Sequence, residues 1–217
     1  MRVPPDDRPV AALAVKVCGV RRLEDARACA AAGASHAGLN RVAGARRCVA
    51  VQAVPDLVRA LGPVQPVLLY RNSPLSQILS ESSELGIGWV QLHGSESLAL
   101  GHSLSSAGLR LIRALPDTAD RQLLLDWLDL AEVLLLDGAD PGSGQPRQWH
   151  LPSALDPRRT WLAGGLTPTN VAQVLENAAV AGVDAASGLE SDGLLDPQKI
   201  ADFAHAARQA AVIRSQG

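Results

Sequence analysis

The amino-acid sequence predicts a single-domain (β/α)8 barrel. Eight short apolar runs, each followed by a stretch of helical character, begin roughly every 20 to 30 residues along the 217-residue chain. The runs are continuously apolar rather than alternating, which is typical of parallel strands that helices cover. The length suffices for one sizeable core but is short for two domains. We therefore expect one domain over residues 1–217, with residues 1–10 as a flexible N-terminal extension.

Each of the eight apolar runs is a predicted strand. The first, residues 14–18, reads Ala-Val-Lys-Val-Cys, and the sixth, residues 133–136, reads Val-Leu-Leu-Leu, both of the length expected for buried strands. The other six are predicted at residues 36–40, 64–70, 89–92, 109–114, 160–163 and 183–186. A doubly wound open sheet is the competing arrangement, but it more often carries a glycine fingerprint after its first strand, and the segment Cys18-Gly19-Val20-Arg21 is not one.

Helical signals lie between these strands. Residues 23–32 are rich in alanine and carry Glu24 and Asp25 in their first turn, where the helix dipole favours acidic groups. Residues 74–85 begin with proline after Ser73, which is a suitable N-cap. Further helices are predicted at residues 171–178 and 198–213, while residues 116–130 have a mixed periodicity.

The composition argues against several classes of function. With 20 basic and 22 acidic residues the net charge is -2, which argues against a nucleic-acid partner, because phosphate backbones are bound by clustered lysine and arginine. No stretch approaches the roughly 20 apolar residues of a membrane span, and the N-terminus lacks a secretory pattern. The three cysteines are an odd number without metal-ligand spacing, so we expect a cytoplasmic protein with reduced thiols and no metal. The sequence has no cofactor motif, so we expect no cofactor.

The predicted fold places the active site at the carboxyl ends of the strands. Cys18 ends the first strand and Asp137 follows the sixth, so a thiol and a carboxyl group are expected to face each other across the mouth, as general acid–base catalysis requires. A free cysteine is also commonly a small buried apolar residue, and an aspartate after a strand commonly caps a loop. Residue type alone leaves these alternatives open.

Glycine-rich loops follow the last three strands. They contain Gly142 and Ser143 after the sixth strand, Gly164 and Gly165 after the seventh, and Ser187 and Gly188 after the eighth. Barrel enzymes often bind phosphate through backbone N–H groups of the last two loops, and glycine lets the main chain approach the anion closely. Plain turns are the alternative, but two such loops together favour a phosphate site.

Charged side chains at other strand ends are candidates for substrate binding. Arg46 and Arg47 follow the second strand, where they either grip a carboxylate or form a solvated loop pair. On an extended segment neighbouring side chains point to opposite sides, so only one of the two is expected to face the pocket. His93, Arg113 and Asp184 also lie at strand ends, and His93 either moves protons or makes a structural hydrogen bond.

Several motifs occur in one order along most of the chain. They are KVCG at residues 16–19, QLHG at 91–94 followed by Glu96, LLD at 135–137, AGGLTP at 163–168, VD at 183–184 and SGLE at 187–190. In this combination they resemble the phosphoribosylanthranilate isomerases of tryptophan biosynthesis. The resemblance runs from about Val15 to Phe203.

The resemblance implies an Amadori rearrangement of N-(5-phosphoribosyl)anthranilate, an aminoaldose, to the corresponding aminoketose. It implies that Cys18 is the general base, that Asp137 is the general acid and that Arg47 holds the anthranilate carboxylate. The loops at residues 164–165 and 187–188 would hold the phosphate. The implied partner is a small phosphosugar, bound by a monomer or a homodimer.

The chain departs from the family pattern around the substrate site. Arg21 stands where threonine is usual, Leu39 lies in what is usually an aromatic run, and Ala186 replaces a serine. The alternatives are another phosphosugar enzyme on the same barrel, a non-catalytic phosphosugar-binding paralogue of altered specificity, and a structural subunit of a biosynthetic complex.

Overall fold

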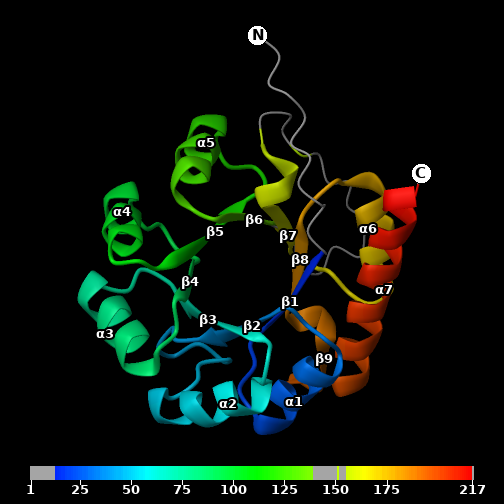
Figure 1. Ribbon diagram of the computed structural model, residues 1–217, viewed down its shortest axis with the longest axis horizontal. Coiled ribbons are helices and arrows are strands. Elements are labelled where there is room, and N and C mark those ends of the chain that lie inside the picture. Colours follow the sequence, from blue (N-terminus) through cyan, green and yellow to red (C-terminus); the bar gives the residue numbers. More distant parts are fainter. Residues whose placement is uncertain (1–12, 139–150, 152–154, 217) are drawn as a thin grey trace.

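The computed structural model describes residues 13–138, 151 and 155–216, and the predicted extension at residues 1–10 lies outside this part of the chain, as do Gly142 and Ser143. Eight parallel strands, β1 to β8, close into a barrel in sequence order, with β8 pairing with β1 (Figure 1). Helices surround the barrel on its outer side (Figure 1). The predicted single-domain (β/α)8 barrel is confirmed, and the open-sheet alternative is wrong.

Four of the predicted strands match the structure at both ends, and the others differ by one or two residues. The strands are β1 Ala14–Cys18, β2 His36–Asn40, β3 Gln65–Tyr70, β4 Trp89–Leu92, β5 Arg110–Pro116, β6 Val133–Asp137, β7 Thr160–Ala163 and β8 Gly182–Ala185. The α-helices are α1 Leu23–Ala31, α2 Val54–Leu61, α3 Leu75–Leu85, α4 Leu98–Ser106, α5 Arg121–Leu130, α6 Val171–Asn177 and α7 Pro197–Gln216.

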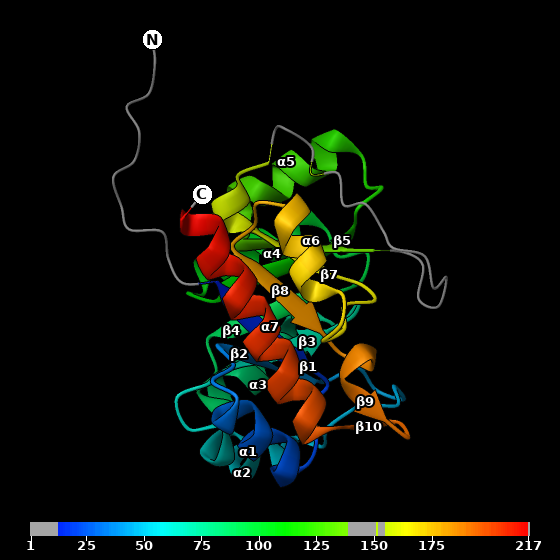
Figure 2. The ribbon, with the colours of Figure 1, turned by 90° about the vertical axis from the view of Figure 1, so that its right-hand side faces the viewer.

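Short elements complete the described chain. They are the 3-10 helices η1 Val51–Ala53, η2 Pro157–Arg159 and η3 Ser187–Leu189, and the strands β9 Glu190–Ser191 and β10 Leu194–Leu195. The last two pair antiparallel as a small hairpin between β8 and α7. Figure 2 shows this hairpin in orange at one end of the barrel, beside the start of α7.

The structure corrects the N-cap of α3 and resolves the segment of mixed periodicity at residues 116–130. Ser73 is not the N-cap of α3, because Pro74 is still extended, with φ −66° and ψ 148°, and takes the N-cap position without a side-chain bond. In the segment of mixed periodicity, β5 continues through Pro116, and α5 then starts after Asp120, whose carboxylate accepts from the backbone N–H of Gln122 at 2.8 Å. The mixed signal thus reflects a strand end, a turn and a helix in one segment.

Apolar side chains fill the barrel and the space between strands and helices as two separate clusters. The cluster inside the barrel consists of Val67, Trp89, Ile112, Ala114, Val133, Leu135, Trp161 and Ala163. The outer cluster contains the intervening strand residues, such as Leu134 and Leu162, together with residues of the helices. Because side chains alternate along a strand, this division fixes which residues face inward, and Leu135 therefore puts Asp137 on the inner side.

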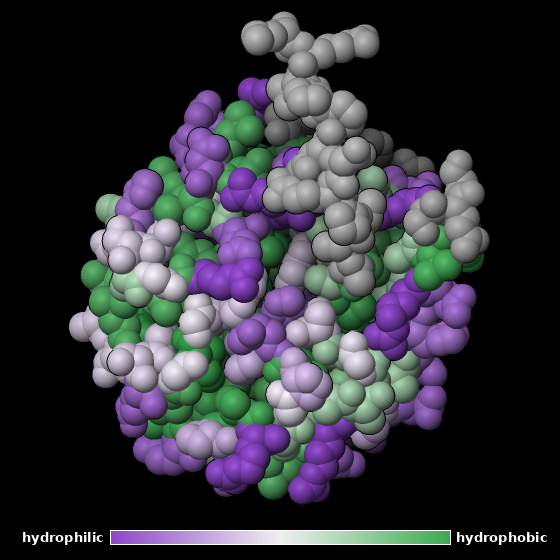
Figure 3. Space-filling model, viewed as in Figure 1, coloured by the Kyte–Doolittle hydropathy of each residue, from purple (hydrophilic) through white to green (hydrophobic). Residues whose placement is uncertain are grey.

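The outer surface in Figure 3 carries hydrophobic and hydrophilic residues interspersed over the face viewed down the barrel. Large exposed apolar side chains in the described part of the chain are few, and they include Val212 and Ile213 near the end of α7. None of the described helices combines the length and the apolar character that a membrane crossing requires.

An aromatic cluster lies near the amino ends of the strands. The His36 ring packs edge-on against Trp89, with the centroids 5.2 Å apart, and against Trp161, with the centroids 4.9 Å apart. The guanidinium of Arg110 stacks on the Trp89 ring at 4.1 Å from its centroid. Burial, with a smaller contribution from the charges of Lys16 and Arg110, lowers the pKa of His36 to about 4.

This histidine is expected to make the fold sensitive to acid. An unfolded histidine binds its proton near pH 6.5, whereas the folded His36 stays neutral down to about pH 4. Protonation of His36 therefore does not lower the free energy of unfolding above pH 6.5, and it lowers this free energy increasingly as the pH falls from 6.5 to 4. The expected loss of unfolding free energy is up to about 3 kcal/mol. Urea unfolding of the wild type and of His36→Phe across this range measures it. Equal slopes of unfolding free energy against pH in the two proteins would contradict the assignment.

Candidate active site

A cavity of about 640 Å³ opens at the carboxyl ends of the barrel strands. Candidate residues that the sequence singled out line it together, namely Cys18, Arg47, His93, Asp137, Gly164, Gly165, Asp184, Ser187 and Gly188. Asn40, Leu69 and Arg71 also line it. The alternation of side chains along the strands explains this convergence. Residues that point into the barrel, as Leu135 and Ala163 do, reach the cavity at the carboxyl ends of the strands.

A buried ion pair lies beside Cys18. The Lys16 ammonium, fully buried inside the barrel, donates to Asp184 Oδ2 at 2.8 Å, and its charge also acts on the Cys18 thiol. The strands set this pair, since Lys16 and Asp184 are directly opposite in the β1–β8 register. Gly38 on β2 leaves room for it, because a Cβ there would lie 3.0 Å from Cys18 Sγ and 3.3 Å from Lys16 Nζ.

The environment of Cys18 acts on its pKa in both directions. Burial raises the pKa of the thiol and is the largest influence, the Lys16 ammonium lowers it, Asp184 raises it and Arg47 lowers it. The outcome is a thiol pKa above its ordinary value. Burial alone lowers the pKa of Lys16, but Asp184 and Cys18 more than reverse this, so the ammonium remains charged beside the thiol.

Asp137 lies at the end of β6 and pairs with His93 from the end of β4. His93 Nε2 is 3.2 Å from Asp137 Oδ2, and both side chains are more than a third exposed to the cavity. On its other side the ring meets Gln91, whose Nε2 is 3.1 Å from His93 Nδ1. With Gln91 donating to Nδ1, a neutral His93 carries its proton on Nε2, the nitrogen nearer to Asp137.

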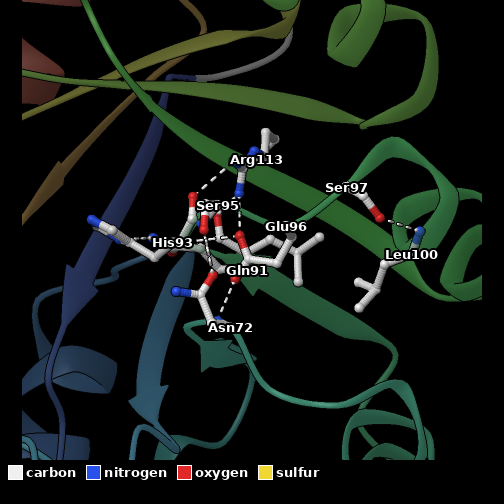
Figure 4. Close-up of polar contacts among 10 residues, drawn as sticks. Asn72, Gln91, His93, Ser95, Glu96, Ser97, Leu100 and Arg113 are labelled. Atoms are coloured by element: carbon white, nitrogen blue, oxygen red, sulfur yellow. Dashed lines mark hydrogen bonds and ion pairs between the residues drawn. The ribbon is translucent and has the colours of Figure 1, made fainter.

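The loop that carries His93 is held by a buried carboxylate, that of Glu96 (Figure 4). Glu96 accepts from the backbone N–H groups of Asn72 and Gly94, each at 2.8 Å, and pairs with the Arg113 guanidinium. Arg113 was a candidate for the mouth, but it lies outside the cavity, because it alternates with the inward-facing Ile112 and Ala114 of β5 and packs over Trp127. It is therefore a support of the β4–α4 loop.

Arg46 and Arg47 lie in a turn rather than on an extended segment. The expectation that they point to opposite sides is therefore wrong, and both guanidinium groups reach the Glu190 carboxylate, Arg47 Nε at 2.6 Å from Oε1 and Arg46 Nη2 at 2.7 Å from Oε2. Only Arg47 of the two lines the cavity. Its side chain is 24% exposed, against 53% for Arg46.

The two glycine loops contact each other at the mouth. A Cβ at Gly188 would overlap the carbonyl oxygen of Leu166, so the loop after β8 lies directly against the loop after β7. Gly164 has φ +90°, and a side chain there would overlap the backbone of Gly138 after β6. Gly165 has φ +67° with open space where a Cβ would stand. These approaches require glycine and leave backbone facing the cavity.

Three site features were not predicted from the sequence. The first is Lys16, whose signal is that a charged residue two positions before Cys18 in a buried strand requires an inward-facing partner. The Glu190 contact with the arginines gave no local signal. The hairpin around Asp192-Gly193 has a local signal, because an Asp-Gly pair favours a tight two-residue turn. Within the described ranges no three His, Cys, Asp or Glu side chains are grouped to hold a metal.

Comparison with known proteins identifies the family. Residues 15–206 match the family model described as N-(5'phosphoribosyl)anthranilate (PRA) isomerase. The N-(5'-phosphoribosyl)anthranilate isomerase of Synechococcus sp. is 35% identical over 202 residues, which cover 87% of this chain and 93% of the relative. The crystal structure of phosphoribosyl anthranilate isomerase from Thermus thermophilus is 35% identical, with a TM-score of 0.78 over 92% of this chain and 100% of the relative.

A second solved structure adds a ligand. It is a phosphoribosyl anthranilate isomerase in complex with reduced 1-(o-carboxyphenylamino)-1-deoxyribulose 5-phosphate, 26% identical, with a TM-score of 0.74 over 91% of this chain and 99% of that one. The family match, the sequence relatives and the fold agree with one another. The chain therefore belongs to the N-(5'-phosphoribosyl)anthranilate isomerase family.

Proposed function

We propose that this chain isomerises N-(5-phosphoribosyl)anthranilate to 1-(2-carboxyphenylamino)-1-deoxyribulose 5-phosphate, with Cys18 as general base and Asp137 as general acid. The observation that carries the assignment of roles is that a thiol from β1 and a carboxyl group from β6 line one cavity. Family membership supports the reaction and does not favour a non-catalytic paralogue.

The first step opens the sugar. Protonated Asp137 donates its proton to the furanose ring oxygen as the bond from that oxygen to C1 breaks, and the nitrogen lone pair forms a Schiff base at C1. The carboxylate that Asp137 becomes can then accept a hydrogen bond from His93 Nε2, which is 3.2 Å from Oδ2, and this bond stabilises the new charge. His93 is in this account a hydrogen-bonding partner of the acid.

The second step moves a proton from carbon. The Cys18 thiolate takes the proton from C2, and the electron pair of that bond neutralises the Schiff base to give an enamine. The enamine then gains a proton at C1 and loses the hydroxyl proton at C2, which leaves the ketone. The Lys16 ammonium supports this role, because its positive charge lowers the pKa of the Cys18 thiol and so favours the thiolate.

The carboxylate end and the phosphate end of the substrate are assigned to different residues of the cavity. Arg47 supplies a guanidinium for the anthranilate carboxylate, and the loops at residues 164–165 and 187–188 supply backbone N–H groups for the phosphate. Binding at both ends holds the reacting sugar carbons between Cys18 and Asp137. We also propose that the enzyme acts in the cytoplasm, as a monomer or a homodimer.

Product analysis tests the function. Incubated with N-(5-phosphoribosyl)anthranilate, the purified protein should give a product of unchanged mass whose C2 is a carbonyl carbon by NMR. Two results would contradict the proposed reaction. One is hydrolysis to free anthranilate as the only change, and the other is loss of substrate no faster than its spontaneous decay without the protein.

Replacement of Arg47 is expected to weaken substrate binding. Arg47→Ala should raise KM about 10- to 150-fold, since a hydrogen bond to a charged group contributes roughly 1.5–3 kcal/mol. Arg46→Ala is the matched control and should change KM little, because Arg46 is half exposed and does not line the cavity. Steady-state kinetics of both variants measure this. If the two variants exchange effects, Arg46 is the carboxylate partner, and if neither changes KM, the substrate carboxylate is bound elsewhere.

A phosphate or sulfate ion is expected to bind between the loops at residues 164–165 and 187–188. Crystals grown in sulfate should show the anion within hydrogen-bond distance of their backbone N–H groups. Gly188→Ala should abolish this density, because the added methyl group would overlap the Leu166 carbonyl oxygen and push the two loops apart. An ordered but empty loop pair, with the anion elsewhere at the mouth, would contradict the assignment.

A further inference from the structure

The β9–β10 hairpin is tied to the start of α1 and to the loop after β2 by arginine side chains. Arg22 Nη2 donates to the Leu195 carbonyl at 2.8 Å. Arg21 Nη2 and Arg46 Nη1 both donate to the Gly193 carbonyl, each at 2.8 Å. Arg21 also donates to the backbone carbonyl of Arg46 at 3.1 Å, so the three segments form one connected network.

Glu190 is the point at which this network meets the cavity. Its carboxylate is 9% exposed and binds Arg47 with one oxygen and Arg46 with the other. Burial works to raise its pKa, but the hydrogen bonds from Arg47 and Arg46 outweigh burial and hold the pKa below its ordinary value. Lys199 Nζ donates to the Glu190 backbone carbonyl at 2.6 Å, which fixes the position of the residue from the side of α7.

The geometry of Arg47 leaves its outer edge for a ligand. Glu190 binds Nε at 2.6 Å, and the aliphatic part of the side chain lies across Gly19, where a Cβ would overlap it. A guanidinium held at Nε can still present its two terminal nitrogens to a second carboxylate in a bidentate pair. Glu190 therefore orients Arg47 without using the pair of donors that suits the substrate.

The network includes two arginines that do not line the cavity, Arg21 and Arg46. Both donate to the same Gly193 carbonyl oxygen, so either one can hold the hairpin when the other is removed. The hairpin also follows directly after η3, which carries Ser187 and Gly188. The network thus joins the two loops assigned to opposite ends of the substrate.

We propose that Glu190 is the positioning residue that presents Arg47 to the anthranilate carboxylate, and that Arg21 and Arg46 together hold the β9–β10 hairpin so that this contact persists. The inference rests on the proposed function, because it concerns the carboxylate end of the same substrate. It makes a specific demand: loss of Glu190 must weaken the binding of ligands that carry the carboxylate and spare those that lack it.

Two ligands test this demand. The first is reduced 1-(o-carboxyphenylamino)-1-deoxyribulose 5-phosphate, and the second is the same compound with a phenylamino group that has no carboxylate. Glu190→Gln should raise the Kd of the first about tenfold, the loss expected for a charge-assisted contact, and leave the Kd of the second within about twofold. Turnover at saturating substrate should stay within about twofold, because Cys18 and Asp137 are untouched.

A matched control lies in the same hairpin. Asp192→Asn also converts a carboxylate to an amide, at a turn position outside the cavity with φ 53° that asparagine tolerates, and it should change neither Kd. Arg21→Ala and Arg46→Ala should each have effects within about twofold, whereas the double variant should weaken the carboxylated ligand several-fold, because only the double variant removes both bonds to Gly193. The double variant also serves as the test if Glu190→Gln does not fold.

The outcomes distinguish failure of the proposed function from failure of the positioning role of Glu190. If the wild type converts no substrate and binds neither ligand, the proposed function fails. If the wild type is active but Glu190→Gln weakens both ligands equally, weakens neither or strengthens the first, the positioning role of Glu190 is overturned while the function stands. Additive effects of the two arginine replacements would overturn the shared hold on Gly193.

Discussion

Cys18→Ala is expected to lower kcat by about 10²–10⁴-fold, the contribution typical of a positioned general base. Alanine keeps the packing around Lys16 and Gly38 but has no group that can take the proton from C2. KM should change little, because neither end of the substrate is assigned to Cys18. Stopped or continuous assays of substrate loss with high enzyme concentration measure the residual rate.

Cys29→Ala is the matched control for this replacement. Cys29 is buried in α1, away from the cavity, and burial raises its thiol pKa to about 12, so its removal should leave kcat unchanged. A folded Cys18→Ala protein with near-normal turnover would contradict this role.

Asp137→Asn is expected to reduce kcat to a similar extent, by about 10²–10⁴-fold. The amide is nearly the same size and can still accept the hydrogen bond from His93, so the site keeps its shape and loses only the proton that the acid delivers to the ring oxygen. Substrate binding should therefore be retained, which equilibrium binding of the product analogue measures directly.

Asp129→Asn is a suitable control, because Asp129 is exposed on α5 and lies outside the cavity. It should keep wild-type kinetics. If Asp137→Asn is folded, binds the product analogue and turns over normally, the general acid is a different group, and His93 beside it becomes the first residue to examine.

Much of the fold could be predicted because its signals are local. Each buried parallel strand is a short apolar run, and β1, β2, β4 and β7 match their predicted limits at both ends. Strand ends in this fold converge on one mouth, so Cys18 and Asp137 could be assigned to one cavity without knowledge of their distance.

The features that could not be predicted depend on which side of a strand a residue faces and on contacts between residues far apart in the sequence. Arg113 lies near the end of an apolar run, and whether it faces the cavity or the helices depends on which residues of β5 point into the barrel. The sequence does not show this, because both faces of a buried parallel strand are apolar. The Glu190 contact joins residues 143 positions apart in sequence. Arg46 and Arg47 were assigned opposite sides on the assumption of extended backbone, and the turn at these residues removes that assumption.

The most direct test of the central claim follows the fluorescence of the anthranilate group as purified protein is added to N-(5-phosphoribosyl)anthranilate. The wild type should remove the substrate signal far faster than its spontaneous decay, and Cys18→Ala and Asp137→Asn, measured in parallel at equal concentration, should leave it close to the uncatalysed rate. A wild-type trace that coincides with the traces of both variants would contradict the account.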